Sequence, residues 1–446
     1  MFADRDRIVV LGAGLAGLAA AIHLADAGLR PLVLEAAQVP GGRARSRFDP
    51  AFAEELDNGP HLLMGAYSHT LQLLSRLGTR HLLRAEATPA FTFWERHLGW
   101  HALTCPDWPA PWHLLAALFR FPALSMSDRW AAIRLFPALL ESQPRLEGQS
   151  VTQWLIRHHQ TDTLCQRLWH PLCLATLNEP AASANAALFV SVLKKLFLAD
   201  RQAACPMLPT VPLSQLFANP AQEAIAQMGG ELFCRCRVQR LEWSERTLLA
   251  IHTDRGVCQR PKAVVAALPH TTLARLLPEW AATIRLTALQ SAPIVSVHLT
   301  YAQPASLPVP LVGLPQESSQ WLLDRNRLTA APAEQGRFSA VLSGAYRERT
   351  WSAARLIESV HQDLVRLLPV LANTPPATAR VIKEHRATFA AWPETTQYRP
   401  SSQTPWHNLW LAGDWTETGL PGTLEGAVQS GRVAAQKILD LLANER

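Results

Sequence analysis

The hydrophobic pattern is clearest at the start of the chain. Residues 8–11 form a short β-branched run that predicts a buried strand, and an Ala- and Leu-rich stretch follows it as far as Ala27. Gly28 comes next and is typical of the residue that ends a helix. Because residues 32–34 have the pattern of a second short strand, the segment predicts a βαβ unit and a parallel sheet.

The strand pattern returns after Gly229 and Gly230. We expect strands at residues 231–243, 248–253, 263–267, 294–300 and 409–412. Apolar positions at helical spacing predict helices at 353–368 and 426–442. The strands just after Gly230 are expected to resume the sheet that the first βαβ unit begins.

Residues 81–140 have a different composition, rich in Trp, Phe, Pro, Leu and Arg, and we interpret them as an inserted, mostly helical region. Arg120, Arg129 and Arg134 interrupt its apolar helices. Tryptophans lie on both sides of residues 114–140, at Trp94, Trp100, Trp108, Trp112 and Trp130. Such a basic, tryptophan-flanked pattern is typical of a segment that contacts a membrane surface, and it also fits a buried helix pair.

A chain of 446 residues is long enough for two domains with cores of their own. The formal net charge is +6, but the basic residues are spread along the chain, so a phosphate-rich ligand or an anionic membrane surface fits better than nucleic acid. The seven cysteines lack the spacing of a zinc site or a secreted disulfide framework. Cys234 and Cys236, the one close pair, are expected on one strand as reduced thiols, which indicates a cytoplasmic protein without a metal site.

The N-terminus imitates a secretion signal, because Arg5, Asp6 and Arg7 precede an apolar run that ends in small residues. Three glycines at dinucleotide spacing lie inside that run, and a strand follows it at once. We therefore expect the segment to belong to the mature fold. Elsewhere no uncharged apolar stretch reaches the roughly 18 residues of a transmembrane helix.

Gly12, Gly14 and Gly17 follow the first strand as a GxGxxG motif. Without side chains at Gly12 and Gly14, the backbone can approach a pyrophosphate closely, and Gly17 lets the helix pack on the sheet. The N–H groups at the start of that helix, at Leu15 and Ala16, are expected to hold the negative charge.

Glu35 ends the second strand, where a carboxylate accepts hydrogen bonds from a ribose diol and would repel a phosphate. This favours FAD or NAD over NADP, with Ala36 beside the same ribose. Gly42 and Arg43 follow, and an Arg next to flexible glycines can bend over a pyrophosphate.

Two more polar turns complete the cofactor candidates. Asn58 and Gly59 lie in the turn 57–61, and Gly413 and Asp414 repeat the pattern of an acid at a strand end. The last helix opens near Thr423, Leu424 and Ala427, and its N–H groups could stabilise the anionic edge of a reduced flavin.

Taken together, these blocks resemble the flavin amine oxidase and phytoene desaturase superfamily, in which matching segments share one FAD. The longer runs 56–67, 168–178, 208–217 and 412–421 resemble the hydroxysqualene dehydroxylase family, also called the squalene-associated FAD-dependent desaturases. The resemblance spans nearly the whole chain. Pro60 and His170 depart from the family's pattern, so we do not assign them catalytic roles.

The resemblance implies an α/β fold: a Rossmann-type FAD-binding domain with an interleaved α+β substrate domain, similar to amine oxidases. We assign residues 1–80, 205–270 and 400–446 to the FAD domain, and 81–204 and 271–399 to the substrate domain, with membrane contact at 81–140. The implied reaction is the reduction of hydroxysqualene, or a similar long isoprenoid, to squalene by reduced FAD in squalene and hopanoid biosynthesis. Other enzymes of that pathway are possible partners, and the expected location is the cytoplasm, at the inner face of the membrane.

The resemblance also suggests residue roles: Glu35 at the adenosine ribose, Arg43 near the pyrophosphate, Val238 at the adenine through its backbone, and Asp414 at the ribityl or pyrophosphate region. His61 and Asn178 are the catalytic candidates, and Tyr67 and Glu179 are further candidates for the proton donor. Three alternatives stay open: a carotenoid or squalene desaturase, an amine oxidase, and a flavin-containing subunit that scaffolds an isoprenoid synthase without turnover of its own.

Overall fold

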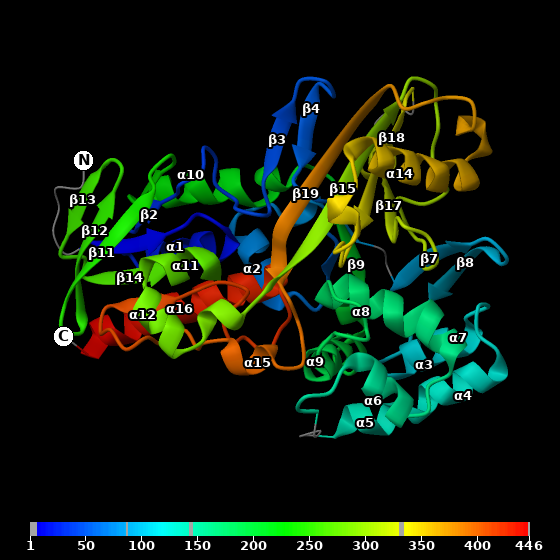
Figure 1. The fold of residues 1–446 in the computed structure, drawn as a ribbon, viewed down its shortest axis with the longest axis horizontal. Coiled ribbons are helices and arrows are strands. Elements are labelled where there is room, and N and C mark those ends of the chain that lie inside the picture. Colours follow the sequence, from blue (N-terminus) through cyan, green and yellow to red (C-terminus); the bar gives the residue numbers. More distant parts are fainter. Residues whose placement is uncertain (1–6, 86–87, 142–145, 330–333, 445–446) are drawn as a thin grey trace.

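The computed structural model describes residues 7–85, 88–141, 146–329 and 334–444, so Arg5 and Asp6 of the imitated signal lie outside the described residues. The molecule is elongated, with a parallel sheet near one end and a larger sheet toward the other (Figure 1). Both ends of the chain lie beside the parallel sheet. Within the described residues, no helix is both long and apolar enough to span a bilayer.

Five parallel strands form the first sheet, in the order β10 (Glu231–Phe233), β2 (Leu32–Leu34), β1 (Ile8–Leu11), β14 (Ala263–Ala266) and β20 (Leu409–Leu411). Its central strands are apolar along their whole length and fully buried, as a sheet covered on both faces requires. The predicted βαβ unit is confirmed, with α1 (Leu15–Asp26) between β1 and β2. Three separated stretches of chain supply these strands, and the exact domain bounds given above stay a prediction.

Two glycines allow the helices and turns around this sheet to pack closely. A Cβ at Gly431 in α16 (Leu424–Asn444) would lie 2.0 Å from the carbonyl oxygen of Ala16 in α1. A Cβ at Gly17 would lie 1.9 Å from the carbonyl oxygen of Gly12. The last helix of the chain is therefore fixed against the first, and the first against the turn that precedes it.

The second sheet has seven strands, in the order β19 (Thr378–Phe389), β15 (Ser291–Tyr301), β18 (Gly336–Leu342), β17 (Trp321–Asp324), β16 (Leu311–Gly313), β7 (Ala90–Glu95) and β8 (Gly99–Thr104). The amphipathic helix α14 (Ala353–Leu367) packs against it and closes a separate apolar core. β15 and β19 are its longest strands, and they run from this sheet toward the first one (Figure 1).

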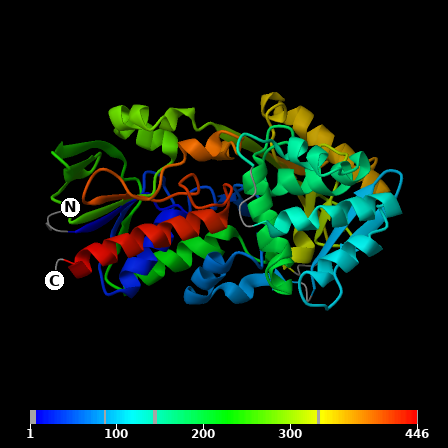
Figure 2. The ribbon, with the colours of Figure 1, turned by 90° about the horizontal axis from the view of Figure 1, so that it is seen from below.

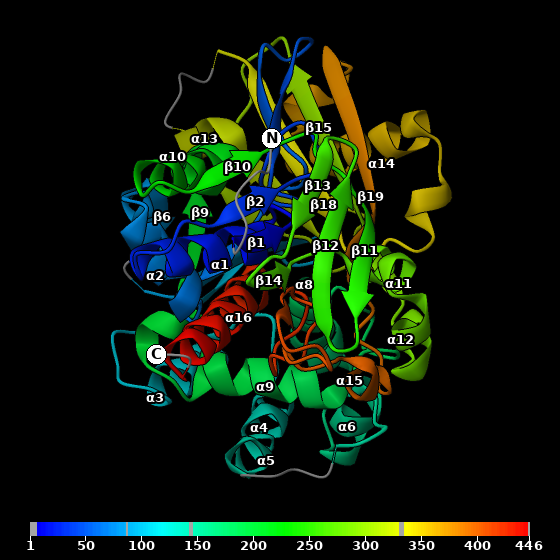
Figure 3. The same ribbon diagram turned by 90° about the vertical axis from the view of Figure 1, so that its left-hand side faces the viewer.

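A group of helices lies against the second sheet at one side of the molecule (Figure 2). Its helices are α3 (Trp112–Arg120), α4 (Met126–Arg134), α5 (Phe136–Leu140), α6 (Val151–Arg157), α8 (His170–Leu177) and α9 (Ala186–Phe197). A π-helical turn, η2 (Cys165–Trp169), leads directly into α8. In the end-on view of Figure 3, α4, α5 and α6 form one extremity of the molecule.

Several expectations were wrong in detail. After the short 3-10 turn η1 (Arg80–Leu82), the described residues of 81–140 are helical only from Trp112 onward. The reason is that the aromatic run 90–104 forms the hairpin β7–β8, whose turn has Gly99 at φ +67°. The single strand expected at 231–243 is two, β10 and β11 (Val238–Ser244), since Arg235 adopts a left-handed conformation between them. Cys234 and Cys236 therefore lie in this break and not on a strand. Both are free thiols, as are the other five cysteines.

Candidate functional site

The glycine turn after β1 leaves space for a ligand. Gly12 has a φ of +97°, and a Cβ there would lie 2.6 Å from the carbonyl oxygen of Ala267. Gly14 has an ordinary φ of −71°, and a Cβ there would meet no described atom within 4 Å. Protein packing thus explains the glycine at position 12 but not the one at position 14. The open space beside Gly14 suits a group that approaches the backbone closely, such as a pyrophosphate.

The start of α1 faces the same space. Gly14 is its N-cap, and no side chain among the described residues caps it or places an acid in its first turn. The first N–H groups of a helix need an acceptor, and the helix dipole favours an anion there. These residues therefore fit the phosphates of a dinucleotide such as FAD.

The turn after β2 lies against this loop. A Cβ at Gly42 would come within 3.0 Å of the Gly14 Cα, and the Gly41 N–H donates to the carbonyl oxygen of Ala13 at 2.7 Å. Glu35, at the end of β2, accepts hydrogen bonds from the N–H groups of Ala13 and Ala37, both at 2.7 Å. Its carboxylate thus holds the two turns together, while its predicted contact with a ribose stays a prediction.

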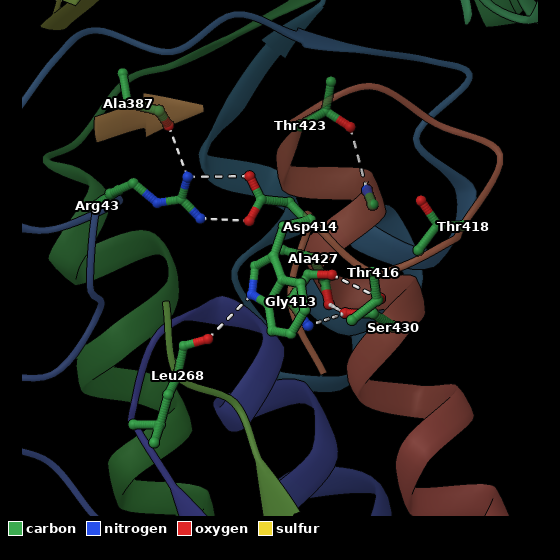
Figure 4. A network of polar contacts seen from close by, with 12 residues as sticks. Arg43, Leu268, Ala387, Gly413, Asp414, Thr416, Thr418, Thr423, Ala427 and Ser430 are labelled. Atoms are coloured by element: carbon green, nitrogen blue, oxygen red, sulfur yellow. Dashed lines mark hydrogen bonds and ion pairs between the residues drawn. The ribbon is translucent and has the colours of Figure 1, made fainter. Parts of the chain in front are cut away.

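Arg43 and Asp414 form a two-point ion pair beside these turns (Figure 4). The guanidinium lies 2.5 and 3.0 Å from the two carboxylate oxygens. Burial disfavours the charge of Arg43, but the carboxylate of Asp414 outweighs this and raises the pKa of the guanidinium. Around Asp414, the Gly413 N–H donates to Ser430 Oγ at 2.8 Å, and Trp415 Nε1 donates to the Leu268 carbonyl at 3.0 Å. The acid is therefore fixed from both sides.

A single cavity of about 760 Å³ brings these segments together. Its lining includes nearly all the residues predicted to bind FAD: Gly12, Gly14, Leu15, Ala16, Glu35, Ala36, Gly42, Arg43, Asn58, Gly59, Val238, Gly413, Asp414, Thr423, Leu424 and Ala427. Gly17 is not part of the lining, because it packs against the Gly12 carbonyl. The cavity is within the size range of small-molecule sites, roughly 300 to 1,000 Å³.

The far part of the cavity is lined by the second sheet and α8. Its apolar residues from the sheet are Ile294, Leu311, Trp321, Leu323 and Val341, with Ala175 and Thr176 from α8, and Ser296, Ser343 and Glu384 are polar members of the same lining. Strand alternation suggested two-faced strands, but it did not indicate which face meets the cofactor half of the molecule. The cavity therefore runs from the glycine turn to an apolar sheet face that sequence reasoning missed.

His61 lines this cavity, and its contacts define what it can do. Its Nδ1 lies 2.7 Å from the carbonyl oxygen of Gly59. A carbonyl only accepts, so Nδ1 is the protonated nitrogen, and Nε2 of the neutral ring is an acceptor. Burial lowers the pKa of His61, which keeps the ring neutral. The neutral ring can accept a hydrogen bond from a hydroxyl and is a poor acid.

Asn178 ends α8 with a left-handed φ of 55° and is 4% exposed. Its Oδ1 accepts from the N–H of Gly344 at 2.6 Å, and its Nδ2 donates to Thr388 Oγ1 at 3.1 Å and to the Pro293 carbonyl at 3.4 Å. The amide thus joins α8 to β15, to β19 and to the turn after β18 at the cavity wall. With both amide ends engaged, it serves mainly to position these segments.

The other two proton-donor candidates have different surroundings. Glu179 is fully buried and accepts from Tyr346 Oη and from Ser183 Oγ, and it lies outside the lining of the cavity that holds Asn178. Burial raises the pKa of Glu179. Tyr67 does line the cavity, and burial raises the pKa of its phenol, so its O–H stays protonated.

Glu384 is a cavity residue that sequence reasoning missed. It lies on β19 opposite Ile294, and Asn58 Nδ2 donates to its carboxylate at 3.3 Å. No motif surrounds it in the sequence, so only the pairing of β15 with β19 reveals it. Glu425, by contrast, belongs to a motif but acts structurally, because it accepts from the N–H groups of His69 and Thr70, both at 2.9 Å, at the start of α2 (Ser68–Arg76).

Comparison with known proteins gives consistent results. The family model described as flavin containing amine oxidoreductase matches residues 15–439. Hydroxysqualene dehydroxylase of Rhodopseudomonas palustris is 34% identical over 96% of this chain and 97% of its own length. The 15-cis-phytoene desaturase of an Oncidium hybrid is 28% identical over 97% of this chain and 77% of its own length. Among solved structures, cyclohexylamine oxidase of Brevibacterium oxydans has a TM-score of 0.73 at 17% identity and covers 99% of this chain and 100% of its own.

Proposed function

Because the chain belongs to the flavin containing amine oxidoreductase family, we propose that it is an FAD-dependent oxidoreductase that reduces hydroxysqualene to squalene. The observation that carries the proposal is the similarity to hydroxysqualene dehydroxylase along almost the full length of both chains. The apolar residues in the far part of the cavity support it, because an isoprenoid chain needs an apolar surface beside the cofactor.

The reaction replaces a hydroxyl with hydrogen. The C–O bond breaks, a proton joins the departing oxygen to give water, and a hydride forms the new C–H bond. Reduced FAD, held by the turns around Gly14 and Arg43, would supply this hydride and a proton, so the two electrons balance. A cavity closed to water would keep the hydroxyl from returning to the carbon.

The cavity residues have different roles in this reaction. His61 accepts a hydrogen bond from the substrate hydroxyl and orients it, since its neutral ring offers an acceptor. Tyr67 provides a protonated O–H in the same cavity. Asn178 keeps α8, β15 and β19 in place around the substrate, so its role is positional.

We also propose that the helices α3 to α6 contact a membrane surface, from which so apolar a substrate must be withdrawn. Large apolar side chains are exposed there: Trp108, Trp112, Phe119, Met126, Trp130, Leu140 and Ile156. Exposed cations lie among them, and the Arg120 guanidinium stacks 5.6 Å from the ring centre of Trp108. Aromatic and basic side chains together suit the interface of an anionic bilayer.

A single turnover tests the reaction. Protein with reduced FAD, mixed anaerobically with hydroxysqualene, should regain the absorbance of oxidised flavin and yield one squalene for each FAD. Unchanged absorbance in the presence of substrate would contradict the proposal. The similarity to a phytoene desaturase makes the oxidative direction the second candidate. Consumption of squalene by the oxidised protein would favour that desaturase activity.

A further inference from the structure

A second cavity, of about 440 Å³, lies next to the first. We call it the side chamber. Most of its lining is apolar and includes Phe93, Leu174, Leu314 and Trp321, together with prolines and alanines. Its polar lining residues are Thr152, Gln166, His170, Gln316 and Gln320, of which Gln166 and Gln316 are exposed. Trp321 also lines the first cavity, so its side chain lies between the two.

The two cavities share a floor and a wall. The floor is the second sheet, in which Gly313, Trp321 and Val341 lie side by side on neighbouring strands. Gly313 faces the side chamber, Val341 faces the first cavity, and Trp321 faces both.

The wall is α8 with its neighbours. Leu174 lines the side chamber and Thr176, half a turn later, lines the first cavity. Beside them, Gln320 of the side chamber accepts a hydrogen bond at 2.6 Å from the N–H of Ser343, which lines the first cavity. One helix and a few side chains therefore separate the side chamber from the first cavity.

Two local features shape the side chamber. A Cβ at Gly313 would lie 2.6 Å from the Phe93 ring, so the glycine lets that ring lie close to the sheet, with its centre 6.0 Å from that of the Trp321 ring. The π-helical turn η2, which contributes Gln166 to the lining, shifts the register of the helix just before α8. π-turns within helices occur often at functional sites.

We propose that the side chamber binds the far end of a long isoprenoid chain whose reacting part lies in the first cavity, with Trp321 as the residue that the chain passes. This deepens the proposed function and rests on it. The first cavity holds the dinucleotide residues as well as the sheet face, so a chain of the length of squalene needs additional apolar space. A shorter isoprenoid does not reach the side chamber.

Equilibrium binding of unreactive chains tests this. Holoprotein is titrated with radiolabelled squalene and with farnesol, a half-length isoprenoid. Ala182→Trp places a large ring on the exposed rim of the side chamber and should weaken squalene binding about tenfold, as expected when roughly two buried methylenes are excluded. Farnesol binding and FAD content should not change. Gln166→Trp, from the other side of the chamber, should act in the same way.

Ala282→Trp, at an exposed position of α12 (Pro278–Thr283) in the other half of the molecule, is the matched control and should change neither affinity. If Ala182→Trp weakens the binding of both isoprenoids equally, or of neither, the proposal that the side chamber binds the end of the chain is wrong. Failure of the proposed function is separate: absent turnover of hydroxysqualene would refute the reaction, while a chain-length preference that Ala182→Trp removes would still support the chamber.

Discussion

Arg43 and Asp414 lie 371 residues apart in the sequence and meet in a two-point ion pair. Arg43 also donates to the Ala387 carbonyl at 2.7 Å, near the end of β19 (Figure 4). One guanidinium thus joins the turn after β2, the loop after β20 and a strand of the second sheet. The pair fixes the two halves of the molecule to each other where the cavity passes between them.

The first prediction follows from this pair. Asp414→Asn leaves Arg43 without its charged partner, and Arg43→Lys removes the two-point geometry. Each change should lower the affinity for FAD about tenfold, which corresponds to the loss of one charge-assisted hydrogen bond. Flavin absorbance per purified chain measures this. Arg96→Ala breaks an exposed ion pair with Glu317 and is the control, so equal FAD loss in that variant would refute the assignment.

The second prediction contrasts two glycines of one motif. Gly14→Ala places a methyl group in open space at an allowed φ, so the protein without FAD should melt within a few degrees of the wild type, while FAD affinity falls. Gly17→Ala drives a Cβ into the Gly12 carbonyl and should destabilise the fold itself by several degrees. Thermal unfolding with and without FAD separates the two. Normal FAD binding by Gly14→Ala would show that the pyrophosphate does not bind at this turn.

The sequence was sufficient for features that local chemistry dictates. Gly12 and Gly14 follow a strand, Glu35 ends the next one, and Asp414 ends a third, so their shared edge was predictable. The parallel sheet requires carboxyl ends to meet there, whatever the rest of the chain does.

Other features depend on assembly and were not predictable in this way. Glu384 and Trp321 reach the cavity only because β19 pairs with β15 and β17 pairs with β18. Alternation gives a strand two faces without saying what each will meet. The hairpin β7–β8 was missed for a related reason: its tryptophans suggested helices at an interface, while pairing of Phe93 with Gly313 places it at the sheet edge.

The third prediction concerns pH. Asp57 accepts from Ser46 Oγ at 2.7 Å and from the Leu213 N–H at 2.9 Å, and burial raises its pKa to about 6. Because the folded pKa exceeds the unfolded one, stability is greatest when the carboxyl is protonated and falls as pH rises through about 6. Asp57→Asn keeps the accepting oxygen. The variant should therefore not lose unfolding free energy as pH rises. A shift of two pKa units limits this difference from the wild type to roughly 3 kcal/mol.

Denaturant unfolding at a series of pH values measures the difference between wild type and Asp57→Asn. The two proteins should have similar stabilities below the usual pKa of an aspartate, diverge between that pKa and about pH 6, and differ by a constant amount at higher pH, with the variant more stable. Parallel curves over this range would mean that Asp57 stays ionised in the folded protein.

The fourth prediction tests membrane contact. Trp112 and Trp130 are 60% and 54% exposed on α3 and α4, so replacing both with Glu should not disturb the core. The double variant should lose binding to anionic vesicles in a flotation assay, because it removes apolar area and adds negative charge. Phe48→Glu and Val433→Glu, at exposed apolar positions elsewhere, should still float. If wild type stays in the soluble fraction at low salt, the helices do not contact membranes.

The last prediction separates the roles of His61 and Asn178. In the proposed reaction, the neutral ring of His61 orients the hydroxyl, and burial lowers the pKa of that ring. Turnover should therefore fall only at acidic pH, below the usual range of histidine, and stay level above it. His61→Gln keeps an acceptor but does not titrate, so it should retain part of kcat and lose this acid limb. Asn178→Ala breaks three contacts that shape the cavity and should raise KM and lower stability with the acid limb intact. An unchanged acid limb in His61→Gln would place the titrating group elsewhere.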